Sequence, residues 1–168
     1  MDSDPDSRGA WPFASLYIAR AYLELRDYDK VWRVIHWLAS LPEYPSGSYF
    51  EMYGNRISPP YAQNGIVPWN WAEIILLVVK NILGLQPEEN AIRVCPRLLP
   101  GLNCARGSVP FRNRRVFFDF RRDDLVAGPE FLVDSQPFEP AGEGLRVPFS
   151  GKDIHIEGIL PSARRGRG

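Results

Sequence analysis

The sequence predicts an α+β protein in which helical hairpins precede an antiparallel, sandwich-like β-domain. Up to about residue 86, apolar residues recur at helical spacing, and prolines stand where helices would begin. From Gln86 on, short runs rich in Val, Ile and Phe are broken by Pro and Gly turns, as in strands. We therefore expect a helical domain over residues 1–86, a β-rich domain over 87–161 and a basic, disordered tail over 162–168.

The composition is that of a folded protein and excludes some functions. Of the 168 residues, 45% are hydrophobic and 24% are charged, as in ordinary globular chains. Basic and acidic side chains number 20 each, so the net charge gives no reason to expect a nucleic-acid or membrane partner. Five Trp, seven Tyr and nine Phe suit a large core or a surface on which flat ligands stack.

Three helices are expected in the first domain, over residues 12–26, 28–41 and 68–83. The first is apolar on more than one face, as in a helix buried on two sides, whereas the second is amphipathic. The first and third begin with a proline, whose missing N–H is no loss in a first helical turn. Gly84 is placed to end the third helix.

Five strands are expected in the second domain, over residues 91–95, 115–121, 130–133, 145–149 and 153–159. Arginines and phenylalanines alternate around the second of them, and this group comprises Arg106, Arg112, Arg114, Arg115, Arg121, Arg122, Phe111, Phe117 and Phe118. Such interleaving occurs in proteins that bind single-stranded nucleic acid. At zero net charge, a solvated strand face opposite a Phe-lined core is the favoured interpretation.

A short repeat precedes two of the predicted helices. Gly9-Ala10-Trp11-Pro12-Phe13 matches Gly65-Ile66-Val67-Pro68-Trp69 in its glycine, proline and aromatic positions, at an offset of 56 residues. That period leaves room for an inner helix, an outer helix and a long loop, which is one hairpin of an α/α toroid. A chance match is the alternative interpretation.

The loop from Ser46 to Trp71 is the strongest candidate for a functional site. Long irregular loops in compact domains are usually functional, and this one places the carboxylate of Glu51 among aromatic residues. Aromatic faces stack on sugar rings, polar groups bind hydroxyls, and a carboxylate in such a setting can act as a general base on water. The predicted substrate-binding residues are Tyr49, Phe50, Tyr61, Trp69, Trp71, Asn55, Arg56 and Gln63. The alternative is that Glu51 is a solvated loop acid and the aromatics belong to the core.

Two further charged residues are candidates for a role. Glu73 is a second candidate acid, but it lies near a helix start, where the helix dipole favours negative charge, so a structural role is the favoured interpretation. Arg20 lies within an apolar helix, where an ion pair with a carboxylate would be its ordinary role.

Together these stretches resemble the six-hairpin (α/α)6-barrel glycosidases, which include glucoamylase-like, debranching and α-L-rhamnosidase-like enzymes. The opening repeat with Tyr22-Leu23-Glu24-Leu25-Arg26-Asp27-Tyr28 looks like a toroid hairpin. Phe50-Glu51 followed by Pro68-Trp69-Asn70-Trp71-Ala72-Glu73 is similar to the layout in which a loop glutamate, the catalytic base, precedes a Trp-containing helix start. The segment over residues 84–100 looks like the junction where a C-terminal β-domain begins.

The resemblance implies the last hairpins of an (α/α)6 toroid, a β-domain, and Glu51 as the general base of inverting glycoside hydrolysis. Such barrels have six hairpins, whereas this chain holds about one and a half, and the family's general acid has no counterpart here. The expectation is therefore a C-terminal portion of a glycosidase that is inactive alone. Its partners would be an oligosaccharide or glycoside and the missing N-terminal part of the barrel.

Other classes stay open. A non-catalytic carbohydrate-binding protein could use the same loop, and residues 17–41 have the look of a tetratricopeptide unit, although no 34-residue echo follows. Neither His36 nor His155 has a neighbour at metal-ligand spacing, and nucleotide-binding glycine motifs are absent from the sequence, so we expect no metal and no cofactor. The acidic first residues lack a signal-peptide core, residues 74–79 are too short to span a bilayer, and Cys95 and Cys104 are expected reduced, which together predict a cytoplasmic protein.

Overall fold

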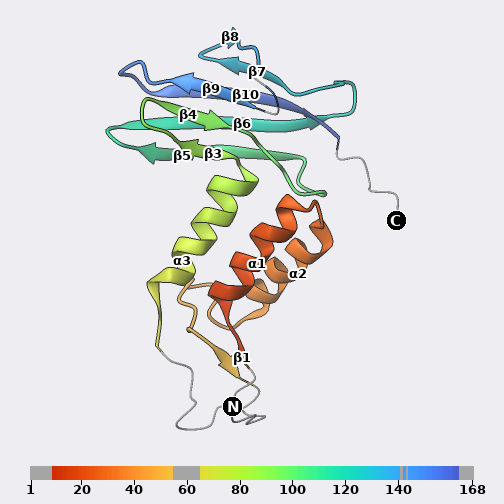
Figure 1. Ribbon diagram of the computed structural model, residues 1–168, viewed down its shortest axis with the longest axis vertical. Coiled ribbons are helices and arrows are strands. Elements are labelled where there is room, and N and C mark those ends of the chain that lie inside the picture. Colours follow the sequence, from red (N-terminus) through yellow and green to blue (C-terminus); the bar gives the residue numbers. More distant parts are fainter. Residues whose placement is uncertain (1–8, 55–64, 141, 143, 163–168) are drawn as a thin grey trace. The chain divides into compact units, whose positions relative to one another are not determined.

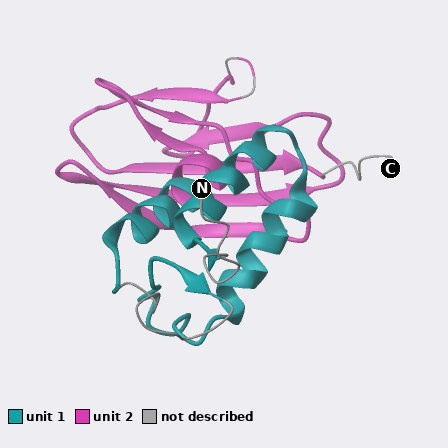
Figure 2. Ribbon diagram, turned by 60° about the horizontal axis from the view of Figure 1, so that its bottom comes forward, with its two compact units in different colours: residues 1–78 teal, residues 79–168 magenta. Residues whose placement is uncertain are grey.

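The structure is a computed structural model, and it describes residues 9–54, 65–140, 142 and 144–162 (Figure 1). The chain divides into two compact units, residues 1–78 (unit 1) and 79–168 (unit 2) (Figure 2). The expected domain boundary after residue 86 stays a prediction. The expected tail lies, from Ala163 on, outside the described residues.

Unit 1 contains three α-helices and a small ladder. Its elements are β1 (Gly9–Ala10), α1 (Pro12–Glu24), α2 (Tyr28–Ser40), β2 (Tyr53–Gly54) and α3 (Pro68–Ile75). Helices α1 and α2 form a hairpin, and α1 also packs against α3 (Figure 1). The tight connection places Arg26 at φ 59°, and the carboxylate of Asp27 caps α2 by accepting from the Lys30 amide. Leu16, Leu23 and Val31 are fully buried in this small core.

All three predicted helices are present, and the two proline-led starts are alike. Pro12 and Pro68 each occupy the first turn, after extended N-cap residues, Trp11 and Val67, that make no side-chain cap bond. The third helix changes its winding after Ile75. A π-helical segment, η2 (Leu76–Ile82), continues it to within two residues of Gly84, whose φ of 68° ends it.

Unit 2 contains two sheets. Its strands are β3 (Leu85–Pro87), β4 (Ala91–Val94), β5 (Cys104–Phe111), β6 (Arg114–Asp123), β7 (Glu130–Val133), β8 (Gln136–Pro137), β9 (Leu145–Pro148) and β10 (Ile154–Pro161). One sheet has the order β5-β6-β10-β7-β8 and the other β3-β4-β9. Strand β10 pairs in parallel with β6 and antiparallel with β7, so the larger sheet is mixed.

A single hydrophobic core joins the two sheets of unit 2. It takes alternate side chains of the strands, such as Phe118 and Phe120 of β6 and Ile154 and Ile156 of β10. The smaller sheet contributes to the same core; its members there are Leu85, Ile92, Val94, Leu145 and Val147. The apolar side chains on one face of each sheet thus form a single layer between the sheets, from which water is excluded.

The five predicted strands are all present, within two or three residues of their expected ends. The short strands β3 and β8 were not predicted, nor was the longer β5, which contains Gly107 and Pro110. It lies at the sheet edge, where a proline without an N–H is tolerated. Gly107 is close-packed as well, because a Cβ there would lie 3.0 Å from the ring of Phe118.

The predicted toroid is wrong. The described residues contain three short α-helices, and strands make up most of the remaining regular structure. After α3 and η2 the chain does not enter another outer helix but turns at Gly84 into β3. The prediction of an antiparallel β-domain also fails at the parallel β6–β10 pair. Of the predicted fold class, only the mixture of α-helices and β-strands is present in the structure.

Two findings concern the cysteines and the membrane. Cys95 is buried, Cys104 is exposed, and neither forms a disulfide within the described residues. Within the described ranges, no helix has the length and apolar character needed to cross a membrane.

Candidate functional site

Both copies of the sequence repeat pair with the loop that carries Glu51. Before α1, Gly9 and Ala10 pair antiparallel with Gly54 and Tyr53. Before α3, Ile66 forms an antiparallel bridge with Phe50. Glu51 and Met52 therefore lie between two β-pairings, each made by the segment that leads into a proline-started helix.

Asn70 fixes the backbone just before Glu51. Its side chain is fully buried in the first turn of α3, and its Nδ2 donates to the carbonyls of Phe50, at 3.0 Å, and Tyr49, at 3.4 Å. A buried carbonyl without a hydrogen-bond donor is costly, so the Asn70 amide stabilises the loop by bonding these two carbonyls and also fixes its position.

Two aromatic side chains add to this fixation. The indole N–H of Trp71 donates to the carbonyl of Gly47. The hydroxyl of Tyr53 donates to the Glu43 carboxylate at 2.9 Å and accepts from the Phe50 amide at 3.2 Å. The amide and the carbonyl of Phe50 are thus both bonded by side chains, the amide by Tyr53 within the same turn and the carbonyl by Asn70 of α3.

Glu51 itself is half-buried. The following residue, Met52, packs over Gly9 so closely that a Cβ on that glycine would overlap its side chain. With Phe50 bonded on one side and Met52 packed on the other, the Cα of Glu51 has little freedom to move. A carboxylate in such a place can act from a fixed position.

The predicted aromatic residues fall into two groups. Trp69 and Trp71 are each 43% exposed, in the first turn of α3. Tyr49 is 4% exposed and Phe50 half-buried, so their rings mainly pack within unit 1. Burial raises the pKa of the Tyr49 phenol, as expected for a group whose charged form is poorly solvated.

The remaining predicted site residues are Asn55, Arg56, Tyr61 and Gln63, and they lie outside the described residues. Tyr49, Phe50 and Glu51 thus lie in one loop, and that loop is hydrogen-bonded to the first turn of α3, which carries Trp69 and Trp71.

Glu73 is occupied by an ion pair. The residue is 7% exposed, and its carboxylate lies 2.8 Å from the Arg20 guanidinium of α1. The expected structural pairing of Arg20 is thereby confirmed, and its partner is the other acid that the sequence singled out. Removing either partner would leave the other charge without its counter-ion in a mostly buried place.

Three residues of the site were not identified from the sequence. Glu43, Tyr53 and Asn70 carry the hydrogen bonds that hold the loop, but each resembles an ordinary surface residue in a loop or helix start. For Asn70, the signal was a lone amide between two tryptophans in an otherwise apolar helix turn.

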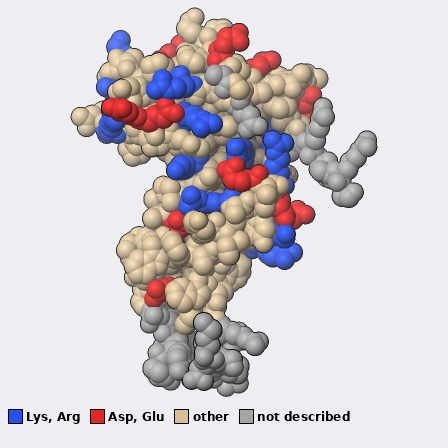
Figure 3. All heavy atoms as spheres, in the orientation of Figure 1, with Lys and Arg blue, Asp and Glu red and all other residues tan. Residues whose placement is uncertain are grey.

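Charged side chains are scattered over unit 1. Figure 3 shows blue basic and red acidic side chains of unit 1 among a mostly tan surface. In the described part of the chain, no group of three His, Cys, Asp or Glu side chains is placed to hold a metal ion.

The chain matches no model of a known protein family, and no curated protein matches it.

Proposed function

We propose that the chain takes part in glycoside hydrolysis and that Glu51 is the general base. The observation that carries this proposal is the double anchoring of the loop: Glu51 lies between two β-pairings, and the buried Asn70 amide holds the carbonyl of the residue before it. Catalytic groups need such support, because small displacements cost large factors in rate.

The neighbouring surface supports a sugar as the substrate. Trp69 and Trp71 are each 43% exposed. They lie in the first turn of α3, and Trp71 is hydrogen-bonded to Gly47 in the loop that carries Glu51. Exposed indole faces stack on the C–H faces of sugar rings, a contact that needs no charge on the ligand.

The proposed chemistry is inverting hydrolysis. The Glu51 carboxylate would accept a proton from water while the water oxygen attacks the anomeric carbon and the bond to the leaving oxygen breaks. That leaving oxygen needs a proton from a separate acid. Since Glu73 is bound to Arg20, we assign no acid within this site and expect the chain alone to leave aryl glycosides intact.

Glycosyl fluorides test the base without the acid. Fluoride is a weak base and departs without protonation, so a positioned base and a bound sugar suffice for hydrolysis. We expect the purified chain to release fluoride from one anomer of a panel of glycosyl fluorides. Glu51→Gln should lower that rate by roughly 100-fold or more, the contribution expected of a general base.

The matched control is Asp29→Asn, which removes an exposed carboxylate from α2. It should leave fluoride release unchanged. Equal rates for wild type and Glu51→Gln would refute the assignment of the base. Oligosaccharide binding without any fluoride release would instead favour a non-catalytic carbohydrate-binding protein.

A further inference from the structure

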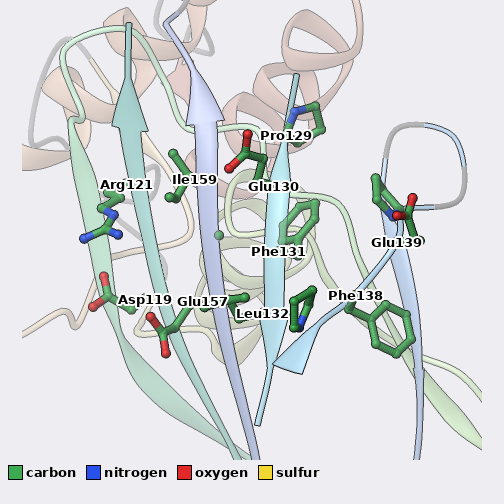
Figure 4. Close-up of a pocket in the computed structure, with 13 residues that line it drawn as sticks. Asp119, Arg121, Pro129, Glu130, Phe131, Leu132, Phe138, Glu139, Glu157 and Ile159 are labelled. Atoms are coloured by element: carbon green, nitrogen blue, oxygen red, sulfur yellow. The ribbon is translucent and has the colours of Figure 1, made fainter. Parts of the chain in front are cut away.

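Unit 2 contains a cavity on the outer face of its larger sheet. Its volume is about 650 Å³, and β6, β10 and β7 line it together with the segment that follows β8 (Figure 4). None of the residues predicted from the sequence as site residues lies here. The cavity is therefore separate from the Glu51 loop and needs its own explanation.

Strand alternation gives the cavity an apolar floor. Phe120 and Phe131 point into the core between the sheets, so Ile159 of β10 and Leu132 of β7 face outward. Phe138, which follows β8, closes one side, and its amide donates to the Phe131 carbonyl at 2.9 Å. Figure 4 shows Ile159 between Arg121 and Glu130 across the neighbouring strands.

Carboxylates surround this floor. Asp119, Glu130, Glu139 and Glu157 all belong to the lining, whereas Arg121 is its cationic member. Asp119 is already bound by Arg106, whose Nε lies 2.9 Å from its carboxylate. The side-chain carboxylates of Glu130, Glu139 and Glu157 make no ion pair and no hydrogen bond within the described residues, although Glu157 lies within electrostatic reach of Arg106.

The register sets the spacing of two of these carboxylates. Glu157 pairs with Leu132, and Ile159 pairs with Glu130, so the two glutamates lie on adjacent strands and two residues apart along them. Strand spacing and rise per residue then separate their Cα atoms by about 8 Å, with Ile159 and Leu132 on the other diagonal.

We propose that this cavity binds an aliphatic diamine or polyamine. Its two ammonium groups would pair with Glu157 and Glu130, and its methylene chain would lie on Ile159 and Leu132. Charge complementarity favours such a ligand over a neutral one, because unpaired carboxylates outnumber the single arginine of the lining. The apolar floor favours an organic cation over a metal ion, since methylenes gain from burial there.

The test is a titration of the full chain with hexanediamine, followed by methyl NMR. We expect the signals of Ile159 and Leu132 to shift, while that of Leu145, in the core between the sheets, stays in place. Glu130→Gln and Glu157→Gln should each weaken binding by up to roughly five-fold, the upper range for an exposed ion pair. Raising the salt concentration should weaken binding further.

Three controls keep the ligand chemistry separate from general charge effects. Glu89→Gln removes an exposed carboxylate from a turn outside the cavity and should change nothing. Hexylamine should bind more weakly than hexanediamine, and hexanediol more weakly still. Arg121→Gln should strengthen binding, because it removes the cation of the lining.

The site is refuted if the Ile159 and Leu132 signals do not move. It is equally refuted if hexanediol binds as tightly as the diamine, or if the double variant Glu130→Gln/Glu157→Gln keeps full affinity. If Glu89→Gln weakened binding as much as Glu157→Gln does, the binding would depend on the overall charge of the protein, and the site would again be refuted.

Discussion

The guanidinium of Arg20 in α1 lies 2.8 Å from the carboxylate of Glu73 in α3, and this ion pair joins two helices through residues 53 apart in sequence. The carboxylate end is nearly buried, with 9% of its side chain exposed, whereas 24% of the arginine side chain is exposed. The pair fixes the helix whose first turn also holds the Glu51 loop. Its loss should therefore affect both stability and the site.

We expect Glu73→Leu to lower the free energy of unfolding by about 3 kcal/mol, because it leaves a partly buried guanidinium without its carboxylate. Arg20→Met/Glu73→Leu should recover a substantial part of that loss, since neither charge is then left alone. Urea unfolding of the two single variants and the double variant measures the coupling. Strictly additive losses would show that the pair does not couple α1 to α3.

Asn70→Asp should destabilise unit 1 by about 2 kcal/mol. The substitution keeps the size of the side chain but replaces the Nδ2 donor by an oxygen facing the carbonyls of Tyr49 and Phe50. Denaturant unfolding gives the loss, and near-ultraviolet circular dichroism reports the altered aromatic environment. The exposed Asn90, changed to Asp, serves as the control and should unfold like wild type.

The two exposed tryptophans of α3 should respond differently to substitution. Trp71→Phe removes the indole donor to the Gly47 carbonyl and should cost about 1 kcal/mol of stability. Trp69→Ala, which breaks no hydrogen bond known in the described residues, should leave stability nearly unchanged but abolish oligosaccharide binding. Sugar binding that survives Trp69→Ala would contradict the stacking role.

The pKa of Tyr53 gives a stability change at high pH. Burial, together with the hydrogen bond to the Glu43 carboxylate, raises its pKa from 10.0 to about 12. Because the unfolded chain loses the phenol proton first, the stabilising contribution is complete below pH 10 and is lost as the pH rises toward 12. Unfolding free energies measured across this range should fall more steeply for wild type than for Tyr53→Phe.

Gly84→Ala should be strongly destabilising. Gly84 has φ 68°, and a Cβ there would overlap the carbonyl of Cys95, so we expect a loss of at least about 3 kcal/mol. Gly101, at φ 91°, has open space around its missing Cβ, and Gly101→Ala should cost only about 1 kcal/mol of backbone strain. Similar thermal midpoints for the two variants would show that the close approach to Cys95 is unimportant.

Local chemistry made much of the fold predictable. A proline that occupies a first helical turn, or a glycine that follows a last one, acts within a few residues, so Pro12, Pro68 and Gly84 marked helix ends correctly. Strand β5 was missed because an edge strand accepts a proline that an inner strand would exclude. The parallel β6–β10 pairing depends on contacts distant in sequence, which no local pattern records.

The repeat shows how a correct local observation led to a wrong architecture. Both copies do begin helices, but in the structure they also pair with the same loop, at Gly54 and at Phe50. The spacing of the repeat in the sequence is the same whether its copies begin two successive hairpins or form β-pairings with one loop between them. For the site, loop length and aromatic content singled out Glu51, whereas the role of Asn70 depends on its complete burial.

The placement of β10 has a consequence for how this protein is made. The last strand that the structure describes, β10, pairs with β6 on one side and with β7 on the other, so both strands have an unpaired edge until β10 is in place. Because the chain is synthesised from its N-terminus, the larger sheet cannot close until Pro161 has left the ribosomal exit tunnel. Until then Phe118, Phe120 and Phe131 lack part of their packing, so this is the interval in which aggregation is most favoured.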